Sequence, residues 1–375
     1  MAINYMDKHA AQIDEAFAAA SVTDRAINKD YDFTGVRTVK VHSVPTIANG
    51  DYTSSGSNRY GTPDELGDNV QELTLVPDRA FTFTVDKGNS DDDAALNSAA
   101  ALRRQIDKKI VPEVDKYRFA TMAVKAGNRT YGVLTGTGNG PYERVLEAGV
   151  QLDADDVPAE GRMLFMTSTF HKKLKLDTNF IKASDVGQGM LIKGQIGEVD
   201  NMPVFKDRGR LPEGVDFLIC ISEATTAPWK LSEYRTHIDP PGINGVLIEG
   251  RNRYDAFVLN NKKDGLCIYR STKIKLTPTN AMGASGKTKF TAVTGATVLD
   301  GTAKVALGTL CYAISAGAIA AADIGMDISN ITNYPELTFD ADITCAASDK
   351  YRVYLKDADG KLIGESDQGT VARGA

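Results

Sequence analysis

The chain has 375 residues, a formal net charge of −6 and four cysteines. This length allows two or three domains with an ample core, and the acidic balance argues against a protein that reads nucleic acid through a basic face. The cysteines are far apart and lie in apolar or β-like runs, so we expect small buried side chains rather than disulfides or metal ligands. They are Cys220, Cys267, Cys311 and Cys345.

The first 45 residues predict a short amphipathic helix followed by an extended arm. Residues 3–20 place Ile13 and Phe17 on one helical face. The same residues carry acidic side chains and lack a continuous apolar stretch, which argues against a secretory signal peptide. Val39 and Val41 then alternate with polar residues, as in a β-strand.

Residues 46–88 predict a polar, glycine-rich excursion that returns as strands. Strand character comes back at residues 73–75 and 81–85, and Pro77 between these runs predicts an edge position or a bulge. The segment has too few apolar residues for a core of its own, and a long two-stranded ribbon is only marginally stable in water. We therefore expect a neighbouring subunit to cover it; the alternative is a loose surface loop.

One long helix is predicted from the acidic cluster at residues 91–93 to about Ala126, a length of roughly 50 Å. Pro112 removes a backbone donor inside this run and clashes with the preceding turn, so we expect a kink near residues 107–109. The alternative is two helices that meet at Pro112. The apolar stripe of the helix consists of Leu102, Ile106, Ile110, Val114 and Tyr117.

Residues 140–274 predict a mixture of helices and strands. Proline at the first position favours a helix at residues 141–153, and a shorter helix is expected around residues 170–174. A glycine-bearing loop is expected at residues 182–195. The predicted strands and hairpins are residues 163–166, 197–205, 215–221, 245–259 and 266–270.

The composition shifts near Ser271 toward threonine, alanine, glycine and aspartate. Short β-like runs between turn signals predict an appended small β-sandwich-like domain at residues 275–375, joined by a linker at residues 277–285. Residues 357–360 give a hairpin signal. The uncharged run at residues 305–322 is weakly apolar and lacks basic flanks, which favours a buried strand pair or a packed helix over a membrane span.

The sequence predicts no catalytic, cofactor or metal site. The glycines of residues 135–140 do not form a dinucleotide-binding fingerprint, because Pro141 closes the spacing too early. Residues 281–288 fit a loosened phosphate-loop pattern around Lys287, but a strand-like run follows where a phosphate loop needs a helix. The histidines show no ligand spacing; they are His9, His42, His171 and His237.

The order of these segments resembles the tailed-phage major capsid proteins of the Hong Kong 97-type fold. Two of the matching motifs are Arg59-Tyr-Gly-Thr-Pro63 and Pro240-Pro-Gly-Ile-Asn-Gly245. The resemblance covers about residues 1–270, and the order of the motifs is its specific feature. The other matching segments are residues 31–41, 71–74, 79–87, 101–107, 111–114, 182–185, 194–197 and 254–260.

The resemblance implies an α+β fold with an N-terminal arm (residues 1–45), an extended loop (46–88), a peripheral domain built on the long spine helix (89–139 and 241–274) and an axial domain (140–240). It implies a non-enzymatic protein that assembles with itself, as hexamers and pentamers, into an icosahedral shell around double-stranded DNA. The protein would be made in the host cytoplasm and located in the virion capsid. Scaffold, portal and decoration proteins are the implied partners; no cofactor or membrane is implied.

Two departures from the type member of this family stand out. The arm begins almost at Met1, so a separate scaffold protein is expected in place of a cleaved N-terminal scaffolding segment. The extended loop has Lys87, at its base, as its one lysine, which argues against a covalent cross-link from a loop lysine to a neighbour's asparagine.

We expect mixed charges on the loop and the spine helix to set the register between subunits, with Arg103 and Arg104 pairing with loop carboxylates such as Glu65 and Asp68. An encapsulin-type shell, which shares the fold but encloses protein cargo, is the alternative. A nucleotide hydrolase that uses Lys287 is a third reading; the appended domain and the long polar loop favour a virus. The expected interface residues are Asp51, Arg59, Glu65, Asp68, Arg79, Lys87, Arg103 and Arg104.

Overall fold

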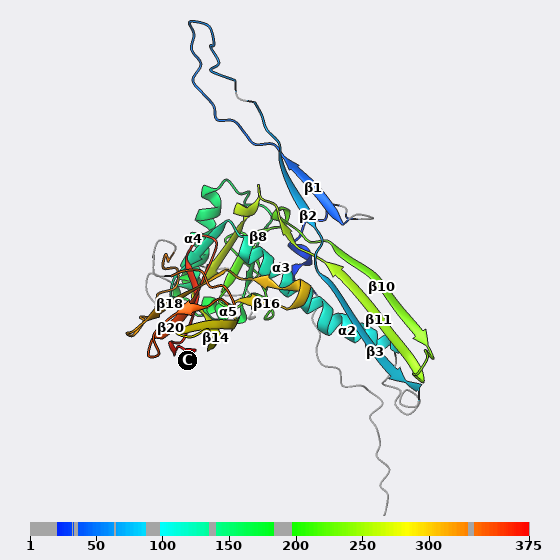
Figure 1. The fold of residues 1–375 in the computed structure, drawn as a ribbon. Coiled ribbons are helices and arrows are strands. Elements are labelled where there is room, and N and C mark those ends of the chain that lie inside the picture. The colour runs from blue at the N-terminus through cyan, green and yellow to red at the C-terminus, as the bar shows by residue number, and fades with distance from the viewer. Residues whose placement is uncertain are drawn as a thin grey trace, which may run out of the picture.

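The computed structural model describes residues 21–31, 33, 37–63, 65–87, 98–134, 140–183, 197–328 and 334–374. Within these residues the chain is α+β, with a mixed body, a long ribbon, a projecting loop and a β-rich C-terminal region (Figure 1). The helix expected at residues 3–20, the acidic helix start at residues 91–93 and most of the loop expected at residues 182–195 lie outside the described residues.

One helical run forms the axis of the body. Helix α2 (Ser98–Gln105) continues through a π-helical segment (Ile106–Ile110) into α3 (Val111–Lys125) without a break. The ring of Pro112 would clash with the preceding turn of a regular α-helix, and the wider π-turn relieves that clash. The irregularity therefore lies where a kink was expected, and the alternative of two separate helices is wrong.

A six-stranded mixed sheet packs against α3, with the strand order β4-β13-β8-β5-β7-β6. Every residue of β8 and of β13 is buried, as the continuous apolar runs predicted. Alternate side chains of these strands enter two different clusters: Leu218 and Ile268 join the cluster of α3, while Phe217 and Tyr269 join that of α4 and α5. The strands are β4 (Asn128–Tyr131), β5 (Arg162–Met166), β6 (Glu198–Val199), β7 (Met202–Lys206), β8 (Phe217–Ile221) and β13 (Leu266–Arg270).

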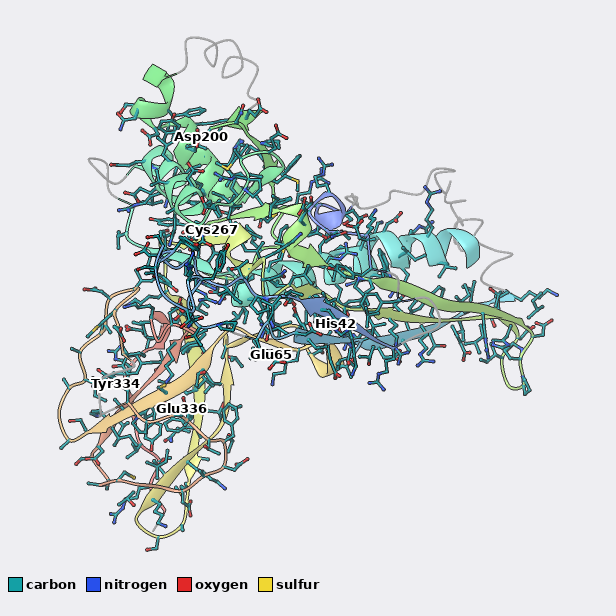
Figure 2. All side chains as sticks on the ribbon, turned by 90° about the horizontal axis from the view of Figure 1, so that it is seen from above. His42, Glu65, Asp200, Cys267, Tyr334 and Glu336 are labelled. Atoms are coloured by element: carbon teal, nitrogen blue, oxygen red, sulfur yellow. The ribbon has the colours of Figure 1, made fainter. Side chains whose placement is uncertain are left out.

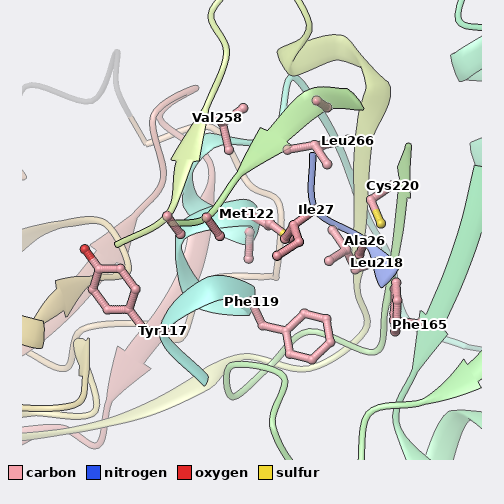
Figure 3. Packing of buried hydrophobic residues seen from close by; sticks show 14 of the residues in the cluster. Ala26, Ile27, Tyr117, Phe119, Met122, Phe165, Leu218, Cys220, Val258 and Leu266 are labelled. Carbon is pink, nitrogen blue, oxygen red and sulfur yellow. The ribbon is translucent and has the colours of Figure 1, made fainter. Parts of the chain in front are cut away.

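The two clusters explain why the sheet has no exposed face at its centre. Figure 3 shows Tyr117, Phe119 and Met122 of α3 together with Phe165 and Leu218 of the sheet. On the opposite face, α4 begins with proline in its first turn, as expected, and α5 is capped by the Thr167 side chain. The covering helices are α4 (Pro141–Ala154), α5 (Ser168–Lys175) and α6 (Thr178–Ala183).

A three-stranded antiparallel ribbon runs beside the helix, in the order β10-β11-β3 (Figure 1). We expected a neighbouring subunit to cover the alternating strand at residues 81–85, and this is wrong in two respects. Strand β3 pairs with β11 of its own chain, and Phe81 packs against the core cluster of α3. The ribbon strands are β3 (Asp78–Asp86), β10 (Trp229–Ile238) and β11 (Gly245–Tyr254).

The projecting loop, residues 44–68, leaves the body from a second antiparallel pair, β1 (Thr38–Ser43) and β2 (Asn69–Thr74). In Figure 1 it extends far beyond every other described element. Pro77 lies between β2 and β3, and β3 is an edge strand of its sheet, as the proline predicted. Short elements fasten the rest of the body: β9 (Thr225–Thr226) with β12 (Phe257–Val258), and the turns Thr23–Arg25, Ser222–Ala224 and Lys263–Gly265.

The C-terminal region forms a seven-stranded sheet in the order β18-β20-β21-β14-β15-β19, with β22 on β20. The linker expected at residues 277–285 is wrong, because residues 274–282 form β14 and a short turn leads into β15. The hairpin between β20 and β21 is confirmed. The strands are β14 (Ile274–Met282), β15 (Lys287–Thr294), β16 (Thr297–Val298), β17 (Val305–Ala306), β18 (Thr309–Ser315), β19 (Ile343–Thr344), β20 (Lys350–Lys356), β21 (Leu362–Ser366) and β22 (Gly369–Thr370).

The C-terminal region has its own core yet packs directly on the body. In Figure 2 it forms a lobe with Tyr334 and Glu336, beside the sheet that carries Cys267. Its core cluster contacts Val124 and Tyr131 of the body. The run expected at residues 305–322 as strands or a packed helix contains β17 and β18. No helix within the described residues is long and apolar enough to cross a membrane.

Candidate assembly surface

The projecting loop exposes apolar side chains that a soluble monomer would have reason to bury. Tyr60 is 90% exposed and Tyr52 is 56% exposed. Contiguous apolar surface of this kind usually marks a contact with another molecule. The large apolar side chains exposed on or beside the loop are Val44, Ile47, Tyr52, Tyr60, Leu66 and Val70.

The tip of the loop is an ordered turn. The Thr53 amide donates to the Arg59 carbonyl at 3.0 Å, and the rings of Tyr52 and Tyr60 meet edge to face with centroids 5.1 Å apart. The Arg59 guanidinium donates to the Gly56 carbonyl at 3.1 Å. These local contacts hold the two tyrosines together on the outside of the chain.

The base of the loop is fixed to the body. Leu73 and Leu75 of the returning chain are fully buried beside Phe33 and Leu259. The Gln71 amide group donates to the Val258 carbonyl at 2.9 Å, and its oxygen accepts from the Asn260 amide at the same distance. The loop therefore projects from a rigid stem.

Charged pairs decorate the stem. Lys40 lies 2.8 Å from Glu72 across the strand pair, and the hydrogen bond from Lys40 lowers the pKa of the Glu72 carboxyl. His42 lies 2.7 Å from Asp68. Asp68 therefore has a partner inside its own subunit, in addition to any spine arginine of a neighbour.

The expected interface residues separate into two groups. Asp51, Arg59, Glu65 and Lys87 are exposed on the loop and its base. On the helix, the Arg103 side chain is 86% exposed and its guanidinium lies 3.8 Å from Asp107 on the next turn, whereas Arg104 is half-buried. Because a single subunit is described, the pairing of loop and helix across neighbours stays a prediction.

Arg79 belongs to a junction within the subunit. Its Nε atom donates to Glu113 Oε1 at 2.9 Å, and a terminal nitrogen donates to Asp300 Oδ1 at 2.9 Å. The Tyr254 hydroxyl donates to the same Glu113 oxygen at 2.7 Å. Any contact of Arg79 with a neighbour, as predicted, would compete with these bonds.

Asp115 on α3 is a fully buried carboxylate that the sequence reasoning missed. It accepts from the Ser21 hydroxyl at 2.7 Å and from the Val22 amide at 3.0 Å, and it pairs with Arg210. It thereby fastens the N-terminal segment and the end of β7 to the central helix. A signal was present, since Asp115 stands inside the most apolar stretch of the helix.

The described residues offer contact surfaces more than chemistry. They contain no group of three or more histidine, cysteine or acidic residues that could hold a metal ion. The four cysteines are free and buried, and burial raises the pKa of Cys220 to about 12. Lys287 begins strand β15, so the phosphate-loop pattern around it lacks the helix that it requires.

Comparisons with known proteins rest on structure. No family profile and no curated protein matches the sequence. A chain from the structure of Mycobacterium phage Che8 is 16% identical with a TM-score of 0.60, and the match covers 72% of this chain and 99% of that chain. A chain of the cyanophage P-SCSP1u capsid is 13% identical with a TM-score of 0.59, over 71% of this chain and 92% of that one.

A chain of the mature capsid of bacteriophage PhiM1 gives a TM-score of 0.57 at 8% identity, again over 71% of this chain and 92% of that one. The chain has the fold of phage capsid proteins. The capsid fold was expected for about residues 1–270, and the 99% coverage of the Che8 chain shows that this protein carries the whole of that fold. The residues beyond the match are additional to the capsid fold.

Proposed function

We propose that the chain is the major capsid protein of a tailed bacteriophage and assembles as hexamers and pentamers into an icosahedral shell around double-stranded DNA. The near-complete coverage of phage capsid chains by this fold carries the proposal. The projecting loop supports it, because its exposed tyrosines and aliphatic side chains gain about 25 cal/mol for each Å² of apolar surface that a neighbour covers.

In this proposal the Hong Kong 97-type parts fall where the sequence placed them. The projecting loop is the extended loop, and α2 and α3 form the spine helix. The peripheral domain takes residues 89–139 and 241–274, and the axial domain takes residues 140–240. The six-stranded sheet joins strands of both, so the two domains share one core and move as one body.

The enclosed DNA is confined rather than bound. A subunit with a net charge of −6 has little to neutralise phosphates, and each neutralised phosphate would steepen the salt dependence of binding. Free subunits should therefore show no measurable affinity for duplex DNA near physiological salt in a fluorescence-anisotropy titration. Tight, salt-sensitive binding would contradict this part of the proposal.

The C-terminal region, residues 275–375, lies on the outer surface of the shell and stabilises it by bridging neighbours. Its separate core cluster supports this role, as does the argument against a lysine cross-link. Removing it before Lys275 should still permit shells, but with a lower disruption temperature in a thermal melt. A truncated chain that cannot fold would show instead that this region belongs to the body.

An encapsulin-type shell is the second candidate, and the solved structures that match, which come from phages, favour the first. Electron microscopy of the expressed protein tests both. Closed shells that package duplex DNA when scaffold and portal proteins are supplied support a phage capsid. Shells that enclose protein support an encapsulin. A protein that stays monomeric with its scaffold partner present would overturn the proposal.

A further inference from the structure

Four elements meet where strand β3 begins. Arg79 of β3 binds Glu113 of α3, and Glu113 also accepts the hydroxyl of Tyr254 at the end of β11. The fourth element is a turn of the C-terminal region, residues 300–303, here called the 300–303 turn. It includes the short helix Gly301–Ala303. The ribbon, the central helix and the C-terminal region are thus joined at one point.

The 300–303 turn holds the first two residues of β3 through backbone and side chain. Arg79 donates to both the carbonyl and the carboxylate of Asp300, at 3.3 Å and 2.9 Å. The Thr302 hydroxyl accepts from the Asp78 amide at 3.2 Å and lies 3.3 Å from the Asp78 carbonyl. The pairing is therefore in register and repeated, unlike a single surface ion pair.

The turn approaches too closely for an ordinary residue at its centre. Gly301 has φ of +57°, and a Cβ atom there would lie 2.9 Å from a guanidinium nitrogen of Arg79. Ala303, which follows, is fully buried in the core cluster of α3. The turn is consequently anchored in the body while it holds the ribbon.

Asp78 extends the junction across the ribbon. Its carboxylate accepts two bonds from Arg251 of β11, at 2.8 Å and 2.5 Å, and lies 3.6 Å from Arg253. Three residues, 75–77, separate β2 from β3, so the chain that returns from the projecting loop enters this junction almost at once. A rotation of β3 would therefore be transmitted to the stem of the loop.

We propose that the 300–303 turn is a brace that fixes the angle between the ribbon and the body, and with it the direction in which the projecting loop meets a neighbour. Arg79 is a positioning residue of this brace. The proposal rests on the proposed shell function and deepens it, because it assigns to the additional C-terminal region a role in the geometry of assembly. It also predicts that the brace acts in the free subunit, before any shell exists.

The test compares two full-length variants that each remove contacts of the C-terminal region with the body. The brace variant is Asp300→Asn with Thr302→Val, which keeps the shapes of both side chains. The control is Asp359→Asn, which removes the pair between Asp359 and Arg129 of β4, at 2.7 Å and away from the ribbon. Asp300 and Asp359 are both partly exposed, so neither change creates a buried cavity.

The first measurement is hydrogen–deuterium exchange of the unassembled subunits. Loss of the brace should speed exchange in residues 78–86 roughly tenfold, about the effect of one or two net hydrogen bonds, while the control leaves those residues unchanged. Equal exchange in the brace variant and the wild type would overturn the proposal. So would an equal rise in both variants, which would show general loosening of the C-terminal region.

The second measurement is the distribution of shell diameters by electron microscopy. The brace variant should give a broader distribution or open shells, and the control should match the wild type. Shells of unchanged diameter from the brace variant would overturn the inference while leaving the proposed function intact. Failure of the wild type to form shells would instead overturn the proposed function, and the exchange result would still report on the brace.

Discussion

The projecting loop and helix α3 use apolar residues in opposite ways. Along α3, Val114, Phe119 and Met122 are at most 1% exposed, because their helical spacing directs them into one cluster. On the loop, Tyr52 and Tyr60 are exposed, since glycines and charged residues interrupt any period that could direct them inward. The first region encodes the fold of a subunit, and the second encodes a surface for another molecule.

This contrast can be broken most strongly at Asp115. Asp115→Ala leaves Arg210, 5% exposed, as a buried charge without this partner, so the free energy of unfolding should fall by about 3–5 kcal/mol. The measurement is chemical denaturation followed by circular dichroism. The matched control on the loop, Asp51→Ala, should stay within about 0.5 kcal/mol of the wild type. A similar midpoint for the two variants would contradict the distinction.

The second prediction concerns the acid side of the body. Burial, with Lys206 and Lys175 nearby, lowers the pKa of His171 from 6.5 to about 4. Below pH 6.5 the unfolded chain takes up a proton that the folded chain refuses until about pH 4, so acid favours unfolding across this window. His171 should therefore cost about 1–2 kcal/mol of stability by pH 4, after allowance for partial solvation.

His171→Gln should flatten this part of the pH profile, measured as the unfolding midpoint at each pH. The exposed His237→Gln is the control and should leave the profile unchanged. If both variants keep the slope of the wild type between pH 6.5 and 4, the slope has another origin than His171.

The third prediction addresses the exposed side of the helix. Reversing Arg103 and Arg104 to glutamate places like charges beside Asp107, which should cost about 0.5 kcal/mol of subunit stability or less. Shell assembly should nevertheless be blocked, with native circular dichroism. Lys125→Glu, at the far end of α3, is the control. Particle yields equal to the wild type, counted by electron microscopy, would remove these arginines from the interface.

The smallest effect on folding is expected from the loop itself. Deleting residues 51–68 removes exposed side chains and leaves the buried anchors Leu73 and Leu75 in place, so the unfolding midpoint should change little. The soluble subunit should make no shells. Normal shells from the deletion would show that the exposed tyrosines serve another purpose, and an unfolded product would show that the loop contributes to the core.

Local signals explain what the sequence predicted. Strands β8 and β13 are uninterrupted apolar runs, and α4 begins at a proline, so each could be placed without knowledge of its neighbours. The projecting loop was predicted for the same reason, since a segment without apolar periodicity cannot build a core. The charges expected on the loop surface at Asp51 and Glu65 are indeed exposed.

The errors concern partners that are distant in sequence. Strand β3 carries a recognisable alternation, but nothing in it names β11, which lies more than 150 residues away, as its partner. Strand β14 was taken for a linker because Thr277, Pro278 and Thr279 are polar or rigid; its pairing with β15 and β21 makes it a strand. Arg79 and Asp115 look like ordinary surface charges until the segments that they join are in place.

The π-helical segment has a consequence for rotational phase. In a regular α-helix, three successive steps of four residues turn a stripe by about 120° around the axis. Leu102, Ile106, Ile110 and Val114 are spaced in that way, yet Ile110 and Val114 are buried and Leu102 and Ile106 are half-buried. The π-turn advances less per residue and cancels the drift. Removing one residue from this segment would restore a regular helix and swing the Arg103 end by about 100°, so the segment works as an angular offset written into the spacing of four aliphatic side chains.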